Sequence, residues 1–167
     1  MASAPLFVSE AEYLCTSYRP DCDYVDGTVI ERNLGQFEHA RLQALILMWL
    51  MQHEQDWGIL VLVEQRLKIR QAKYRIPDVM VLSADAPRTP IIESPPLVCI
   101  EVISPDDRMR DLTARGRDYL EFGVAETWIL DPQERQAYVY SAAGLHQVSE
   151  FALGKITLNP ASLFAQL

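Results

Sequence analysis

The sequence lacks the features that would indicate a membrane or secreted protein. Its longest uninterrupted apolar stretch, residues 44–51, is far shorter than the ~20 residues that a membrane-spanning helix requires. The N-terminus has no basic segment ahead of its first acidic residue, Glu10, so it does not resemble a signal peptide. The chain has three cysteines and no Cys-x-x-Cys pair, which is typical of reduced thiols. We therefore expect a cytoplasmic protein with no membrane partner and no disulfide.

The common catalytic motifs are also missing. His53 and His146 have no ligand spacing to a cysteine or carboxylate, so a zinc site is not expected. The seven glycines are scattered and form no phosphate-binding loop, and no Ser-His-Asp order can be assembled. These absences disfavour zinc chemistry and catalysis by a serine nucleophile.

Basic residues are outnumbered in this chain. The 15 Lys and Arg residues against 23 Asp and Glu residues give a formal net charge of −8, which taken alone disfavours a nucleic-acid partner. Two segments differ, because residues 66–75 hold five basic residues and no acid, and residues 108–117 hold four arginines against Asp111. We expect a positive local field at these segments, with weak and strongly salt-dependent nucleic-acid binding confined to one face.

Local patterns predict two helices and a hairpin at the start of the chain. The S-x-x-E pattern at Ser9 is a capping box and predicts a short helix over residues 10–16. A hairpin over residues 23–33 is expected to turn at Asp26-Gly27. Residues 37–55 have helical spacing, with more apolar side chains than one buried stripe uses. Such a helix is either central in the fold or half used for self-association, and we expect a homodimer.

The rest of the chain predicts a sheet with one further helix. The pattern predicts one long strand over residues 58–70, further strands over 76–83, 97–104 and 126–131, C-terminal strands over 136–167, and a proline-rich loop over 85–96. The helix should have Ser104 as its N-cap, Pro105 as its first residue and Gly123 at its end. The order of elements predicts a single α/β domain over residues 1–167 with a central mixed sheet.

Two acidic residues lie in apolar strands. Glu101 is the one charge within residues 97–103, and an ionised glutamate buried there costs several kcal/mol unless it is paired or binds a metal. Asp78 follows Pro77 at the start of the preceding apolar strand. Two adjacent strands that each present one carboxylate can hold a hard cation such as Mg²⁺. The alternatives are structural: an aspartate that begins a strand, and a buried glutamate satisfied by an arginine.

These residues resemble the bacterial restriction endonuclease family of the PD-(D/E)xK superfamily. The resemblance rests on Pro77-Asp78, on Glu101-Val-Ile followed by Ser-Pro at a helix start, and on several longer segments in the family's order. Those segments, within about residues 10–140, are YVDGTVIER, a helix containing Glu38-His39, YRIPDVMVL, PPLVCIEVISPDDR and YLEFGVAETWILDP.

The resemblance implies a restriction endonuclease-like fold and a metal-dependent nuclease. In such an enzyme, Asp78 and Glu101 would bind Mg²⁺ or Mn²⁺ together with the backbone carbonyl of Val102. The acidic residue Glu31 would complete the site, and the resemblance also implies accessory positions at His39 and Arg75. The reaction would be hydrolysis of a nucleic-acid phosphodiester, with DNA as the expected partner, by a metal-activated water.

The sequence departs from the superfamily at one position. The Glu-x-Lys spacing would place lysine at residue 103, which is isoleucine, and the matching position on the following helix is Arg115. An arginine can bind a phosphate but, with a pKa above ~12, cannot act as a base. Helical geometry puts Arg115 at the border of the buried stripe, whereas a surface pair with Asp111 would be a structural alternative. Lys68 is the reserve candidate for the missing lysine.

Three functions remain open from the sequence. The leading one is a Mg²⁺-dependent endonuclease. The missing lysine favours a catalytically impaired nuclease-fold module that binds DNA or another partner, and a hydrolase of small phosphoesters is the third.

Overall fold

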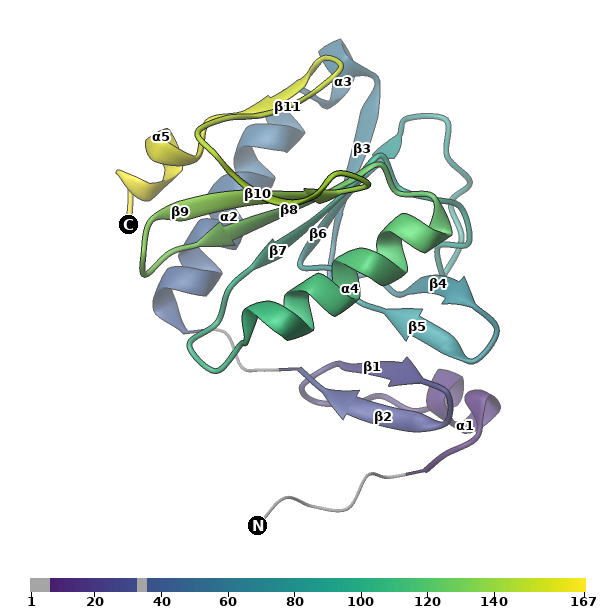
Figure 1. Ribbon diagram of the computed structural model, residues 1–167. Coiled ribbons are helices and arrows are strands. Elements are labelled where there is room, and N and C mark those ends of the chain that lie inside the picture. Colours follow the sequence, from purple (N-terminus) through teal and green to yellow (C-terminus); the bar gives the residue numbers. More distant parts are fainter. Residues whose placement is uncertain (1–6, 33–35) are drawn as a thin grey trace.

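A six-stranded mixed sheet forms the centre of the structure, a computed structural model that describes residues 7–32 and 36–167 (Figure 1). The strand order is β10-β9-β8-β7-β6-β3, and within it β7 and β8 run parallel while the other neighbours are antiparallel. The strands are β3 (Ile59–Val63), β6 (Val79–Ser83), β7 (Val98–Val102), β8 (Glu126–Asp131), β9 (Gln136–Ser141) and β10 (Gly144–Val148). The predicted α/β fold with a central mixed sheet is confirmed.

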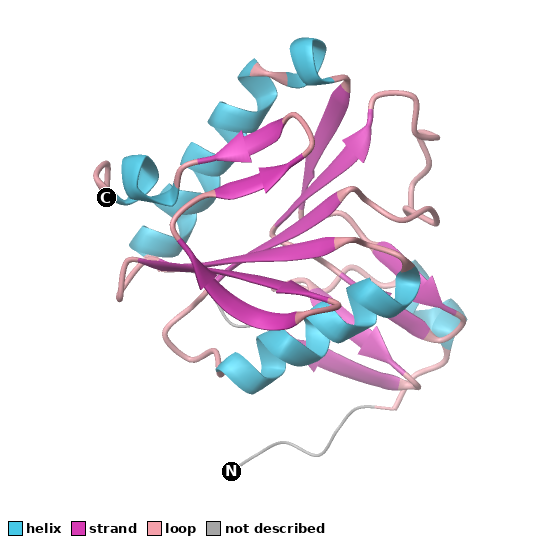
Figure 2. Cartoon of the chain, turned by 45° about the horizontal axis from the view of Figure 1, so that its top comes forward, coloured by secondary structure: helices cyan, strands magenta, loops and turns pink. Residues whose placement is uncertain are grey.

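The central sheet is covered by one long helix on each face (Figure 2). The helices are α2 (Phe37–Gln52) and α4 (Met109–Phe122). Val79 and Val81 of β6 belong to the core on the α2 face, whereas Met80 and Leu82 belong to the core on the α4 face. Successive residues of a strand point to opposite faces, so a continuous apolar run is needed to fill both cores.

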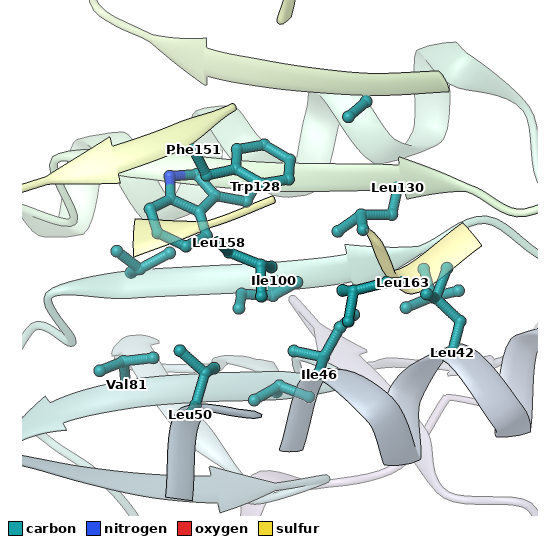
Figure 3. Packing of buried hydrophobic residues seen from close by; sticks show 14 of the residues in the cluster. Leu42, Ile46, Leu50, Val81, Ile100, Trp128, Leu130, Phe151, Leu158 and Leu163 are labelled. Carbon is teal, nitrogen blue, oxygen red and sulfur yellow. The ribbon is translucent and has the colours of Figure 1, made fainter. Parts of the chain in front are cut away.

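The core under α2 is the larger of the two. Leu42, Ile46 and Leu50 project from the helix at helical spacing and pack over the sheet near Ile100 and Trp128 (Figure 3). All five side chains are fully buried. This core fixes β6 and β7, the two strands that position Asp78 and Glu101.

A second, four-stranded antiparallel sheet lies beside the N-terminal end of the chain, in the order β2-β1-β5-β4. Its strands are β1 (Cys22–Val25), β2 (Thr28–Glu31), β4 (Leu67–Arg70) and β5 (Lys73–Arg75), and helix α1 (Glu10–Cys15) packs on it. As predicted, the Ser9 hydroxyl caps α1 by accepting the Glu12 N–H, and the hairpin turns at Asp26 and Gly27, both with positive φ.

The predicted strand over residues 58–70 is wrong. The chain forms β3 and β4 there, and these two strands belong to different sheets. The break is at Glu64, where a φ of 49° lies in the left-handed region and turns the chain out of the central sheet. The predicted strand over residues 76–83 is likewise shortened, because Pro77 has no N–H to donate to a ladder, and β6 begins at Val79.

The helix expected from Pro105 begins later than predicted. It starts at Met109, with Arg108 as the N-cap. The preceding residues form a turn in which the Asp107 N–H donates to the Ser104 carbonyl and the Ser104 N–H donates to the Asp107 carboxylate. The Asp107 side chain thus accepts a hydrogen bond from Ser104, whereas the Ser104 side chain was expected to accept one from the helix. Ser104 is not the helix N-cap.

The C-terminal region is only partly β. After β10 the chain forms a small hairpin of β11 (Phe151–Leu153) and β12 (Ile156–Leu158) and then helix α5 (Pro160–Phe164), which the sequence did not predict. The Asn159 side chain caps α5 by accepting the Ser162 N–H. The predicted helix over residues 37–55 is also divided into α2 and the short α3 (Glu54–Trp57). Within residues 7–32 and 36–167, no helix is both long and apolar enough to cross a bilayer.

Candidate active site

The two acidic residues singled out by sequence lie opposite each other at one end of the β6–β7 pair. Val79 faces Ile100 and Met80 faces Cys99, so the same antiparallel register places Asp78 opposite Glu101. Opposite residues in such a pair share a face, with Cβ atoms ~5 Å apart. That face is the one covered by α4, and both carboxylates are buried.

Glu101 is held by two side chains from α4. The Tyr119 hydroxyl donates to Oε1 at 2.6 Å, and the Arg115 guanidinium donates to Oε2 at 3.1 Å. Both donors lie four residues apart on the helix, which places them on one face. Burial raises the pKa of Glu101 to about 7, against the opposing effect of the Arg115 charge. At neutral pH the Glu101 carboxyl group is therefore close to half protonated.

Asp78 is held by three donors from three parts of the chain. The guanidinium of Arg32, directly after β2, pairs with Oδ1. The Val102 N–H donates to Oδ2 at 2.8 Å, and the His39 Nε2 lies 3.4 Å from the same oxygen. Burial acts to raise the pKa of Asp78, but the His39 hydrogen bond and the Arg32 charge outweigh it and hold this pKa below its usual range.

The two carboxylates thus have pKa values shifted in opposite directions. Asp78 is ionised at neutral pH, whereas Glu101 takes up a proton more easily than a free glutamate does. Burial also acts to lower the pKa of His39, but its hydrogen bond to Asp78 raises it above the ordinary value. Oppositely perturbed neighbours of this kind are concentrated at functional sites.

A second buried cluster of charges adjoins the first. Arg75 donates to Asp118 Oδ2 through Nη2 at 2.6 Å and through Nε at 2.8 Å, and to Asp23 Oδ2 at 2.7 Å. Lys73 completes the pairing of Asp118 at 2.7 Å. The Arg115 Nε lies 3.8 Å from Asp23 Oδ2, so Arg115 links the two clusters.

The structure brings together most of the residues expected at the site. Asp78, Glu101, Arg115, His39 and Val102 converge at the β6–β7 end. The surface pair of Arg115 with Asp111 is not formed, because Asp111 pairs with Arg110 at 3.4 Å instead.

Three other expected residues lie elsewhere. Arg75 belongs to the second cluster. Lys68, on β4, pairs with Glu93 at 3.2 Å. Glu31 is exposed at the end of β2, and among the described residues it makes no hydrogen bond or ion pair with Asp78 or Glu101.

Sequence reasoning missed Arg32 and Asp23. Asp23 lies in a strand that the structure buries at residues 22–24, but it carried no clear signal because Asp21 and Asp26 lie close by in the sequence. Arg32 carried no local signal, because its partner Asp78 lies 46 residues away and meets it only in the folded chain.

Each cation of residues 66–75 has a partner within the protein, which reduces the positive field expected there. Lys68, Arg70, Lys73 and Arg75 all pair with carboxylates, and Arg66 donates to the backbone carbonyls of residues 14 and 16. In the other basic segment, the exposed arginines are Arg108, Arg110 and Arg117.

Asp78 and Glu101 are the candidate ligands for a divalent cation. Among the described residues, no three or more His, Cys, Asp or Glu side chains come together as a metal-binding group. Magnesium commonly takes one or two carboxylates and completes its shell with water and phosphate oxygens. The buried pair of Asp78 and Glu101, facing each other across two strands, supplies that minimum.

Comparisons with known proteins agree with this description of the fold. A family model described as "Uma2: Putative restriction endonuclease" matches residues 9–167. The chain is similar to a solved structure described as a "putative nuclease belonging to DUF820 from Anabaena variabilis ATCC 29413", with a TM-score of 0.84 and 20% identity over 95% of this chain and 98% of that chain.

One further solved structure and the curated proteins were also compared with this chain. A solved structure described as "cryoEM structure DrdV-DNA complex" has a TM-score of 0.40 and 12% identity, over 75% of this chain and 11% of that chain. A comparison with curated proteins gave no match.

Proposed function

The chain belongs to the Uma2 family of restriction endonuclease-like proteins, and from that premise we propose that it is an endonuclease that hydrolyses DNA with Mg²⁺ or Mn²⁺ held by Asp78 and Glu101. One observation carries the proposal. Two buried carboxylates face each other on neighbouring strands, beside the guanidinium groups of Arg32 and Arg115 and the imidazole of His39. Acidic oxygens for a metal and cations for a phosphate are the two requirements of metal-dependent phosphodiester cleavage.

The residues of this chain have separable tasks in that reaction. When bound, the ion would lower the pKa of a water and stabilise charge on the phosphoryl oxygens. Asp78 and Glu101 would hold it, with the Val102 carbonyl as the proposed third protein ligand. Arg115 lies between Glu101 and Asp23. Its guanidinium would bind a phosphate oxygen, because it stays protonated and cannot act as a base.

Plasmid nicking in the presence of Mn²⁺ or Mg²⁺ tests the proposal. The wild type should convert supercoiled DNA to nicked and linear forms, and D78N and E101Q should each lose this activity because each removes one charged oxygen ligand. The matched control is D26N, which neutralises an exposed aspartate paired with Arg70. Activity that survives both site substitutions would refute the assignment, and activity lost in D26N would show that the assay reports folding.

The competing function is a nuclease-fold module that binds DNA without cleaving it. It is favoured by the absence of a lysine at the site, since Lys68 and Lys73 are paired with Glu93 and Asp118. Substitution of Arg115 by lysine distinguishes an impaired endonuclease from a module that only binds DNA. A gain of cleavage in R115K indicates an impaired enzyme, whereas DNA binding that needs no metal in both proteins supports the module.

We further propose that the protein is a homodimer formed through α2. Five exposed side chains follow the alternating four- and three-residue spacing of a helix-pairing seam: Phe37, Arg41, Ala44, Met48 and Met51. M48E should convert a dimer to a monomer in light-scattering measurements. A114E, which adds the same charge to an exposed position of α4, should not. A wild-type monomer at micromolar concentration would refute this proposal.

The proposed location is the cytoplasm. The three cysteines, Cys15, Cys22 and Cys99, are all free thiols in the structure. A reducing compartment keeps such thiols free, and the fold has no need of a disulfide.

A further inference from the structure

Asp78 has no oxygen that is free of a protein donor. Arg32 pairs with Oδ1, while the Val102 N–H and His39 share Oδ2. Each carboxylate oxygen has two lone pairs, so a cation at this carboxylate competes with these three groups for its oxygens. The Val102 N–H belongs to the backbone of a central strand and cannot leave without breaking the sheet.

Of the described residues, Arg32 alone holds Oδ1, so its departure by itself frees an oxygen, whereas Oδ2 is held by both Val102 and His39. Among the described residues, Asp78 is the one hydrogen-bond partner of its guanidinium. Arg115 is different, because it contacts two carboxylates, those of Glu101 and Asp23. An arginine with a single partner loses fewer interactions when it moves.

Arg32 and a divalent cation cannot share Asp78 as the site stands. The pocket lined by Arg32, Asp78, Val102, Arg115 and their neighbours has a volume of about 10 Å³, about the least that holds one water molecule. A magnesium ion keeps several waters and needs more room than this. The Arg32 side chain is also mostly buried, so its charge would repel the ion with little screening by solvent.

We propose that Arg32 is an internal competitor for the metal: it holds Asp78 in the ion-free protein and must move off this carboxylate before a divalent cation binds. The inference rests on the metal site proposed above. It gives Arg32 a role that lowers the apparent affinity for the ion, because only the fraction of molecules with Arg32 displaced can bind it. The ion-free protein is correspondingly stabilised by the Arg32–Asp78 pair.

Binding of Mn²⁺ alone to the purified full chain, followed through the electron paramagnetic resonance signal of the free ion, tests the inference. R32M keeps an apolar side chain of similar length and removes the charge, so it should bind Mn²⁺ roughly tenfold more tightly than the wild type. R70M removes an arginine that pairs with the surface residue Asp26 and should bind as the wild type does. D78N should abolish binding in each background.

The outcomes separate this inference from the function on which it rests. Equal or weaker Mn²⁺ binding by R32M, with binding still lost in D78N, overturns the inference and leaves the metal site standing. Absence of Mn²⁺ binding in the wild type and in R32M, or binding unaffected by D78N, overturns the metal site itself.

A second measurement needs no variant and therefore does not depend on the folding of R32M. Addition of Mg²⁺ to the wild type should shift the Arg32 side-chain N–H signal in ¹H–¹⁵N spectra. The Arg75 signal serves as the internal reference, because its guanidinium is held by Asp23 and Asp118. An Arg32 signal that does not move at saturating Mg²⁺ overturns the inference.

Discussion

Removal of the Arg75 charge should destabilise the protein far more than removal of an equivalent surface charge. The Arg75 side chain is 11% exposed and makes three charge-assisted hydrogen bonds, to Asp23 and Asp118. In R75M both carboxylates stay buried with fewer partners. Lys73 still pairs with Asp118, and the Ile76 N–H still donates to Asp23 at 3.1 Å. Breaking a buried ion pair typically costs 3–5 kcal/mol, and these surviving partners place R75M at about 3 kcal/mol.

The assay is thermal unfolding of the metal-free protein, with R70M as the matched control. For a chain of this size, a loss of about 3 kcal/mol lowers the Tm by roughly 6–12 °C. Arg70 lies on the neighbouring strand and pairs with Asp26, but the two side chains are 50% and 56% exposed, so the Tm of R70M should stay close to that of the wild type. Equal Tm values for R75M and R70M would refute the conclusion that the buried Arg75 charge stabilises the fold through Asp23 and Asp118.

Three further expectations concern the site and the helix that supports it. In the ion-free protein, Glu101 keeps its proton in the folded state between its ordinary pKa of 4.5 and the raised pKa of about 7. The free energy of unfolding should therefore fall by about 3 kcal/mol as the pH rises through this window. E101Q should remove this pH dependence in denaturant titrations. The Tyr119 hydroxyl lowers the pKa of Glu101 by donating to it, so Y119F should move the midpoint of the same pH profile upward. G123A should lose about 1–2 kcal/mol in urea unfolding, because φ is 109° at the end of α4 and an added Cβ would lie 3.2 Å from Pro95. G144A tests the backbone contribution alone, since its φ is 96° and no atom lies within 4 Å of the added Cβ, and it should lose less than G123A.

The sequence was most informative where the polarity of a residue differed from that of its neighbours. Glu101 stood out as a charge in an apolar run, and the structure confirms its burial. Arg115 fell at the border of the buried stripe of its helix, which is where the structure has it, turned toward Glu101. Both inferences used only the local period of a strand or a helix.

Long-range placement could not be predicted in the same way. Residues 59–63 and 67–70 both have strand-forming sequences, so the pattern could not show that they belong to different sheets. The change of sheet depends on one left-handed residue, Glu64, and on the pairing of β4 with β5. Arg32 and Asp23 reach the site only because the β1–β2 hairpin packs beside α4, a contact that no local period encodes.

The same buried clusters change how the net charge of −8 bears on function. Four cations, Arg32, Lys73, Arg75 and Arg115, are matched by four anions, Asp23, Asp78, Glu101 and Asp118. Of the 15 basic and 23 acidic residues, 11 and 19 therefore lie outside the clusters, and the difference there is still −8. A DNA phosphate approaching this protein therefore meets clusters whose formal charges cancel, on a chain with a formal net charge of −8. In the proposed enzyme, a bound divalent cation changes the local charge from zero to positive, so the ion would be needed to attract the substrate as well as to cleave it.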